Sequence, residues 1–416
     1  MIPVMAALAA LTAPSNSPEP AVPTIIEDVR VETGDGRVIE HAHVVIAGGR
    51  IKHVAPSTGI PVDLEGERIR AAGKTLTPGL IETRSNLGLV EISLVKPTRD
   101  FSLAAGNLKP GFAATDGFNP ASVLIPIARA GGITSAIASP RGGIIAGTGS
   151  WIELTGRLDS RPDPAAPVAM FGAVGERAAA GAGGARGGVW LRLRQLVEDT
   201  RFYRANRASF SRGQARPLIL SPLDLEAMIP VIEGRLPLVL EAHRASDILT
   251  ALEFAQTNRI RLVILGGTEA WRVTDELVKA KVPVILTPSE AGPWGFEALG
   301  ARDDAAALLE RAGVTLILSS GGWTHNMGRL RQEAGIAVAY GLPHAAAIRA
   351  ITSRPAEVFG HGKDLGVIAQ GMRANVVLWS GDPLEVTTVA TAVWIDGVRQ
   401  SLDTRQRRLV DRYLSR

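Results

Sequence analysis

The sequence predicts an α/β protein in which a barrel of parallel strands and helices carries a small β domain built from both chain ends. In the middle of the chain, short apolar strands alternate with helical stretches, which is typical of a parallel sheet covered on both faces. Both ends instead show short strands separated by tight turns, which are hairpin signals. The length of 416 residues favours one large domain with a smaller one beside it.

Composition places the chain among ordinary globular proteins. Apolar residues make up 46% and charged residues 21%, close to globular averages. The formal net charge is +4, and the basic residues are scattered, so nucleic acid is not an expected partner. The count of 0 cysteines excludes disulfides, cysteine-ligated zinc and thiol catalysis.

The sequence at the start of the chain predicts that the protein is exported. Residues 1–11 are apolar and rich in alanine, and a spacer rich in proline and serine follows to residue 23. This arrangement is typical of part of a signal peptide, although it lacks the positive region that normally comes first. We therefore expect a periplasmic or secreted protein, with a cytoplasmic protein as the alternative. The stretch is too short to span a membrane, and no membrane span is expected.

We expect residues 24–77 and 366–400 to form one composite β domain. Each part alone offers too few strands for a stable sheet, so we expect the two parts to combine as a small β-sandwich. Residues 401–416 predict a helical tail on the surface. The features behind these predictions are turns at 34–36, 48–49 and 396–397, strands at 44–46, 51–54, 376–379 and 392–395, and the tail residues Arg405, Arg407, Arg408, Arg412 and Arg416.

We expect residues 78–365 to form the barrel. A doubly wound open sheet is the alternative, but it would need a nucleotide-binding fingerprint that the sequence lacks. The glycine- and alanine-rich stretch 178–188 lacks the ending of a phosphate-binding loop and is expected to be a flexible loop. The expected strands are 76–83, 133–138, 236–241, 261–265, 282–287 and 314–319, and the expected helices are 247–257, 268–281 and 303–312.

Several motifs resemble the amidohydrolase superfamily over nearly the whole chain. The segment 77–89, which begins Thr77-Pro78-Gly79, resembles the family's entry into its first barrel strand. Segments 47–51, 72–74 and 365–377 resemble the motifs of its flanking β domain. The resemblance is nearest to imidazolonepropionase-like, often exported amidohydrolases. It implies a TIM-type (β/α)8 barrel and metal-dependent hydrolysis of non-peptide carbon–nitrogen bonds in amides or cyclic amides.

The resemblance also implies metal ligands, and most of the expected positions hold other residues. The family places two histidines after the first barrel strand, one after the fifth, one after the sixth and an aspartate after the eighth. Zinc is therefore the cofactor expected for the family, but we expect this chain to hold no metal, because a catalytic zinc takes three protein ligands and a guanidinium is always protonated. The corresponding residues here are Arg84, Asn86, His243, Gly266 or Gly267, and Ser320.

The remaining polar residues define a candidate site at the barrel mouth. His243 and Ser320 are candidate catalytic residues of a serine–histidine–acid set, although the nucleophile elbow is absent. Arg84, Asn86, Glu241 and Glu269 are candidate ligand-binding residues. A guanidinium inside the mouth needs an acid, so we expect Arg84 to pair with Glu241, with Glu269 or with a ligand carboxylate.

Two functional classes stay open on this basis. The first is a hydrolase that acts on a carbon–nitrogen bond through a remodelled site. The second is a catalytically inactive relative that binds a small amide-like molecule or pairs with an active amidohydrolase. A homo-oligomer is a further expectation. Metal content together with turnover on amides and lactams separates the two classes.

Overall fold

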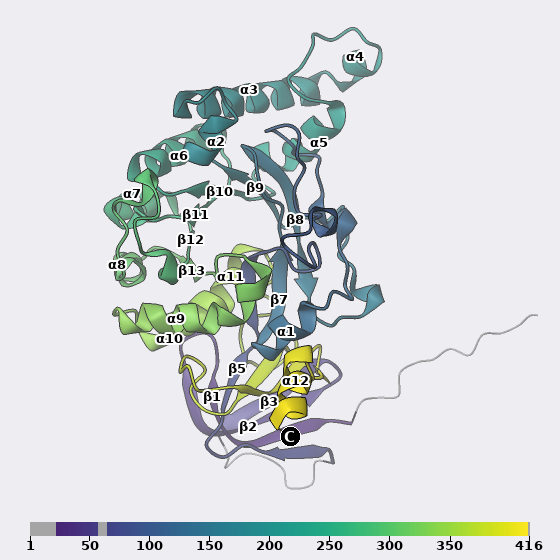
Figure 1. The fold of residues 1–416 in the computed structure, drawn as a ribbon, viewed down its shortest axis with the longest axis vertical. Coiled ribbons are helices and arrows are strands. Elements are labelled where there is room, and N and C mark those ends of the chain that lie inside the picture. Colours follow the sequence, from purple (N-terminus) through teal and green to yellow (C-terminus); the bar gives the residue numbers. More distant parts are fainter. Residues whose placement is uncertain (1–21, 57–64, 415–416) are drawn as a thin grey trace, which may run out of the picture.

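The structure, a computed structural model, describes residues 22–56 and 65–414. Most of the predicted signal peptide lies outside the described residues. The fold is a mixed α/β fold built on two eight-stranded sheets. One sheet curls through the body of the molecule with helices on its outside, and the other lies at one end (Figure 1). We call them the curled sheet and the terminal sheet.

The terminal sheet combines strands from both ends of the chain. β14 pairs antiparallel with β5, and β5 pairs parallel with β1, so the two ends are joined by backbone hydrogen bonds. These strands form a single sheet, and the structure does not confirm the predicted β-sandwich. The strands are β1 (Thr24–Glu32), β2 (Val38–Ala47), β3 (Arg50–Pro56), β4 (Glu67–Arg70), β5 (Thr75–Pro78), β14 (Val376–Trp379), β15 (Ala390–Ile395) and β16 (Val398–Arg399).

The curled sheet has the order β13-β12-β11-β10-β9-β8-β7-β6. Neighbouring strands of this sheet are parallel, except that β8 is antiparallel to both β7 and β9. The strands are β6 (Leu80–Ser85), β7 (Ile133–Ala138), β8 (Ile145–Glu153), β9 (Ala169–Ala173), β10 (Leu238–Ala242), β11 (Leu262–Gly266), β12 (Val284–Leu286) and β13 (Leu316–Leu318).

Side chains at alternate positions of these strands pack into two hydrophobic clusters, one inside the curled sheet and one under the helices. Val239 lies in an inner cluster with Ile317, whereas its neighbours Leu238 and Leu240 belong to the outer cluster under the helices. Successive side chains of a strand point to opposite faces, so a strand buried on both faces is apolar throughout. This explains why strands such as β11, β12 and β13 are nearly continuous apolar runs in the sequence.

Helices cover the outer face of the curled sheet (Figure 1). The expected helix 268–281 is divided into a short 3₁₀ turn and α7, because Val273 between them has non-helical backbone angles. The stretch 178–188, expected to be a loop, contains the end of α2, a short connection at 181–185 and the start of α3. The helices are α1 (Ile125–Ala130), α2 (Glu176–Ala180), α3 (Arg186–Ala205), α4 (Arg207–Ser211), α5 (Pro222–Ile232), α6 (Ala245–Asn258), α7 (Thr274–Ala280), α8 (Ala305–Ala312), α9 (Leu330–Ala339), α10 (His344–Ile351), α11 (Ser353–Val358) and α12 (Arg405–Leu414).

The curled sheet departs from the expected (β/α)8 barrel at β8. The connection between β7 and β8 spans only residues 139–144 and turns at Gly142 and Gly143, whose φ angles are 88° and 87°. A parallel neighbour would need a crossover of about a dozen residues or more, so β8 has to run antiparallel. One strand–helix unit of the predicted barrel is therefore replaced by a strand pair.

The ends of the curled sheet meet without a strand ladder. Among the described residues, no backbone pairing joins β6 to β13. Side chains bridge this gap instead, because Ser319 and Ser320, directly after β13, both bind the carboxylate of Glu82 on β6. We call this contact the seam.

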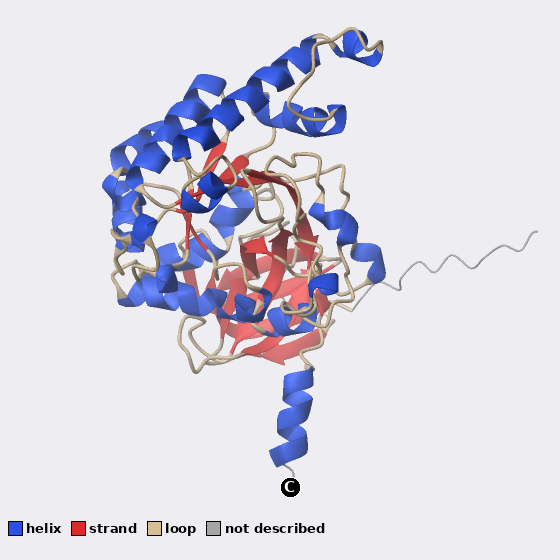
Figure 2. Cartoon of the chain, turned by 45° about the horizontal axis from the view of Figure 1, so that its top comes forward, coloured by secondary structure: helices blue, strands red, loops and turns tan. Residues whose placement is uncertain are grey.

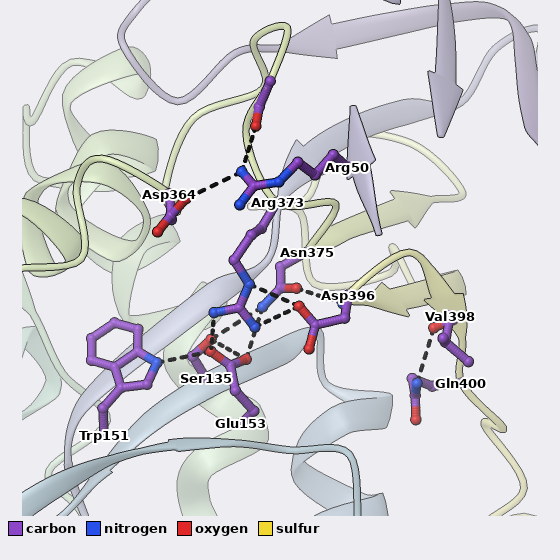
Figure 3. Close-up of polar contacts among 11 residues, drawn as sticks. Arg50, Ser135, Trp151, Glu153, Asp364, Arg373, Asn375, Asp396, Val398 and Gln400 are labelled. Atoms are coloured by element: carbon purple, nitrogen blue, oxygen red, sulfur yellow. Dashed lines mark hydrogen bonds and ion pairs between the residues drawn. The ribbon is translucent and has the colours of Figure 1, made fainter. Parts of the chain in front are cut away.

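A buried polar cluster connects the terminal sheet to the curled sheet (Figure 3). Glu153 at the end of β8 lies 3.3 Å from Nη1 of Arg373, and it accepts a hydrogen bond of 2.8 Å from Nδ2 of Asn375. Trp151 and Ser135 each donate to the same carboxylate at 3.0 Å. Burial raises the pKa of Glu153, and Arg373 is the strongest opposing influence.

The predicted C-terminal helix is present as α12, and it projects from the body (Figure 2). Every residue of α12 is exposed. Within the described part of the chain, no helix has the length and apolar character needed to cross a membrane.

Candidate functional site

A cavity of ≈ 270 Å³ opens at the carboxyl ends of the parallel strands of the curled sheet. Loops at this end of a barrel carry the functional residues of such folds. We call it the mouth cavity. The charged side chains that line it are Arg84 on β6, Arg141 after β7, Arg177 on α2 and Glu241 on β10, and Phe101 and Phe171 contribute apolar surface.

Arg84 and Glu241 form an ion pair across the mouth cavity. Nη2 of Arg84 lies 2.6 Å from Oε2 of Glu241, and the two side chains are only 14% and 20% exposed. Burial alone would raise the pKa of Glu241, but Arg84 and His243 outweigh it and hold this pKa well below its usual range. Of the acids expected to pair with Arg84, the structure brings Glu241 to it.

His243 lies beside this pair. Its Nδ1 is 2.8 Å from the hydroxyl of Thr268, and its Nε2 is 3.6 Å from Oε1 of Glu241. Its ring contacts Trp294 edge-on, with 4.8 Å between centroids. A Cβ at Gly266 would lie 2.4 Å from the imidazole, so the glycine after β11 leaves room for this histidine.

Ser320 contacts Glu82 and not His243. Ser319 and Ser320 donate hydroxyl hydrogen bonds of 2.7 and 2.6 Å to Glu82, and the Ser320 amide donates another of 2.8 Å. The amide of Arg84 adds a fourth donor at 3.1 Å. Burial raises the pKa of Glu82, and these donors oppose that shift. Within the described residues no hydrogen bond joins Ser320 to His243, so the two candidate catalytic residues are not brought together.

Asn86 and Glu269 do not line the mouth cavity. Asn86 is buried and donates a hydrogen bond of 3.0 Å to the carbonyl of Ser139, which ties the end of β6 to the end of β7. Glu269 accepts a hydrogen bond of 2.9 Å from the amide of Ala245 at the start of α6. A carboxylate at a helix start satisfies a free amide and opposes the helix dipole. Both contacts are structural.

Sequence reasoning missed Arg141 and Arg177. Arg141 lies three residues after the end of the buried strand β7, and a charged residue shortly after a barrel strand was the signal available. Its Nη2 donates to the carbonyls of Gly321 and Gly322, and its guanidinium carbon lies 4.9 Å from the ring of Trp323. Burial and the nearby Arg84 lower the pKa of Arg141 to about 9.

The residues at the mouth do not fit a catalytic metal. A zinc site of this kind takes three protein ligands from histidine, cysteine or carboxylate groups. Within residues 22–56 and 65–414, no cluster of three or more such side chains could hold a metal ion. Glu241, the carboxylate that lies 3.6 Å from Nε2 of His243, is bound to the guanidinium of Arg84, a permanent cation that would repel a metal ion.

Comparisons with known proteins point to one superfamily. The chain is 24% identical over 414 residues to the amidohydrolase TasK of Hapsidospora irregularis, an alignment that covers 92% of this chain and 42% of that protein. The chain therefore spans about two fifths of the length of this curated relative. No protein-family model matches the chain.

Solved structures agree with this relative. An amidohydrolase from Thermotoga maritima superposes with a TM-score of 0.81 and 26% identity, over 90% of this chain and 99% of that one. An adenosine deaminase from Xanthomonas campestris with bound zinc shares the fold with a TM-score of 0.52 and 16% identity, over 96% and 98% of the two chains. Together these similarities support the amidohydrolase superfamily.

Proposed function

We propose that this amidohydrolase-type chain binds a small amide or cyclic amide in its mouth cavity and has lost the metal-dependent hydrolysis of the superfamily. The observation that carries the proposal is the ion pair of 2.6 Å between Arg84 and Glu241. By resemblance, Arg84 stands where the family has its first metal-binding histidine. A guanidinium therefore occupies the centre of the mouth and supplies the positive charge that the metal supplies in the family.

The residues around this pair are suited to recognition of an amide group. A guanidinium donates hydrogen bonds to a carbonyl oxygen, and a carboxylate accepts one from an amide N–H. Glu241 is held in its charged form by Arg84, so it acts as an acceptor over the whole neutral range. His243 lies beside Glu241 with 3.6 Å between Nε2 and Oε1, and its Nδ1 lies 2.8 Å from the Thr268 hydroxyl.

The test of this proposal combines metal content, binding and turnover. The purified protein is treated with a chelator, supplied with zinc, analysed for bound metal, and assayed for binding and hydrolysis of a panel of amides and lactams. We expect binding without stoichiometric zinc and without zinc-dependent turnover. Zinc bound at one ion per chain, lost in His243→Ala but kept in the exposed control His325→Ala, would contradict the proposal.

A second candidate function is hydrolysis of a carbon–nitrogen bond without the family's metal. It is favoured by the distance of 3.6 Å between Nε2 of His243 and Glu241, which places two titratable groups beside the ligand site. A histidine oriented by a neighbouring hydroxyl and an acid can serve as a general base toward water. Zinc-independent turnover that disappears in His243→Gln while ligand binding persists would establish this function in place of the first.

A further inference from the structure

We infer that the ligand of the mouth cavity carries a carboxylate, which the guanidinium groups of Arg141 and Arg177 receive. This inference rests on the proposed function, because it assumes that the mouth cavity is the ligand site. It adds a charge requirement that neither the superfamily fold nor the pair of Arg84 with Glu241 imposes.

The charges that line the cavity do not balance. Arg84, Arg141 and Arg177 are cations, and Glu241 is the acid among the lining residues. Glu241 is already bound by Arg84 at 2.6 Å. In the described part of the chain, neither Arg141 nor Arg177 forms an ion pair with an acid. The wall that holds these two arginines is therefore positive, and an anion is the missing complement.

Arg141 is the more constrained of these two cations. Its Nη2 donates to backbone carbonyls at Gly321 and Gly322, so one end of the guanidinium is held in place. Its Nε is buried and has no hydrogen-bond partner among the described residues. A buried donor without a partner costs free energy, and a planar carboxylate can accept from two guanidinium nitrogens at once. The side chain is thus positioned before a ligand arrives.

Arg177 approaches the same cavity from a different element. It lies on α2, directly after β9, and its side chain is exposed. Its charge is close enough to Arg141 to lower the pKa of that group and close enough to Glu241 to lower the pKa of that acid. An exposed arginine that is close to a fixed one can close over a bound carboxylate without disturbing the core.

Three probes of similar size separate the carboxylate from the amide. The probe 5-oxoproline carries a cyclic amide and a carboxylate, 5-oxoprolinamide carries the cyclic amide without negative charge, and cyclopentanecarboxylate carries the charge without the ring amide. Isothermal titration of each into the full-length protein gives its affinity. We expect 5-oxoproline to bind about tenfold or more tightly than 5-oxoprolinamide, the difference typical of a charge-assisted hydrogen bond.

Substitutions at Arg177 and Arg141 test whether these two side chains cause the difference in affinity. Arg177→Gln is expected to weaken 5-oxoproline about tenfold and to leave 5-oxoprolinamide unchanged, and Arg177→Lys is expected to retain most of the affinity. Arg141→Gln should have the same selectivity, but it also removes contacts to the 321–322 backbone, so the exposed Arg177 carries the test. Arg192→Gln on α3, an exposed arginine outside the cavity, is the matched control.

The outcomes distinguish this inference from the proposed function. Equal affinity for 5-oxoproline and 5-oxoprolinamide would overturn the carboxylate inference and leave amide recognition intact. Equal affinity for 5-oxoproline and cyclopentanecarboxylate would uphold the carboxylate site and contradict amide recognition. Absence of binding by both carboxylates, or an unchanged 5-oxoproline affinity in Arg177→Gln, would also overturn the inference.

Discussion

Oγ of Ser320 donates a hydrogen bond of 2.6 Å to Oε2 of Glu82 across the seam, where the described residues show no ladder between β6 and β13. The Ser319 hydroxyl and the Ser320 amide bind the same carboxylate at 2.7 and 2.8 Å. The buried side chain of Glu82 thus joins β6 to the end of β13, whereas backbone hydrogen bonds join the other neighbouring strands of the curled sheet. Ser320 is therefore a structural residue in this geometry, and its hydroxyl is occupied.

The first prediction follows from the seam. Glu82→Ala removes the acceptor for these hydroxyl and amide donors and leaves them buried, so we expect the free energy of unfolding to fall by about 2–4 kcal/mol. Glu82→Gln keeps an oxygen acceptor and should cost less. Urea denaturation measures both, with the exposed Glu198→Ala on α3 as control. A loss in Glu82→Ala no larger than that of Glu198→Ala would refute the role of the seam.

The second prediction concerns the ion pair at the mouth. Arg84→Ala leaves Glu241 buried without its cation, so we expect a loss of about 2–4 kcal/mol in the free energy of unfolding. The double variant Arg84→Ala with Glu241→Ala should recover part of this loss, because it removes the unpaired acid. A double-mutant cycle in urea gives the coupling energy. Additive losses would show that the pair of 2.6 Å contributes nothing.

The third prediction tests the contact between the two sheets. Arg373→Met removes the cation next to the buried Glu153, which keeps its other donors, so the expected loss is about 2–3 kcal/mol. Because Glu153 then gains stability by taking a proton, the variant should be least impaired at acid pH. Thermal denaturation of the variant and the wild type, measured across pH 5–8, tests this expectation. A loss that is the same at every pH would contradict the assignment of Glu153 as the charged partner.

The fourth prediction concerns His344, which connects α10 to the terminal sheet. Its Nε2 lies 3.0 Å from both oxygens of Asp382, and its Nδ1 lies 3.5 Å from Glu32. The hydrogen bond with Asp382 raises the pKa of His344 above its ordinary value of 6.5, with Glu32 and the Asp382 charge adding to the shift and burial and Arg30 opposing it. Its contribution to stability is therefore complete below pH 6.5 and lost as the pH rises through the raised value.

The difference in unfolding free energy between the wild type and His344→Gln should accordingly be largest at acid pH and shrink above neutrality. We expect at most about 1 kcal/mol, because the pair is partly exposed. Burial raises the pKa of Glu32 and the charge of His344 opposes this shift, so His344→Gln also alters the titration of Glu32. The exposed His325→Gln serves as control. A difference that grows with pH would contradict this assignment.

Sequence reasoning was most successful where one strand or one charge decides the outcome. The strand expected at 236–241 is β10 at Leu238–Ala242, because an uninterrupted apolar run specifies a strand buried on both faces. The ion pair of Arg84 was foreseeable because a guanidinium inside a barrel requires an acid. Both arguments need only local pattern and elementary electrostatics.

The features that were missed depend on turn geometry or on contacts between distant parts of the chain, which the apolar pattern does not contain. The antiparallel β8 follows from a short glycine turn whose geometry decides direction, and the apolar pattern alone is the same for either direction. Glu82 and Ser320 are more than two hundred positions apart in the sequence, and their contact exists only because the curled sheet brings its first and last strands together. For Arg141 a local signal was available, but its place in the mouth cavity depends on the folded sheet.

The most direct test of the central claim is a calorimetric titration of 5-oxoproline into the chelator-treated protein, with and without added zinc. If Arg84 supplies the charge at the mouth, the same affinity is expected in both conditions, and Arg84→Ala should abolish the binding. Binding or hydrolysis of 5-oxoproline that appears only when zinc is present would contradict the account.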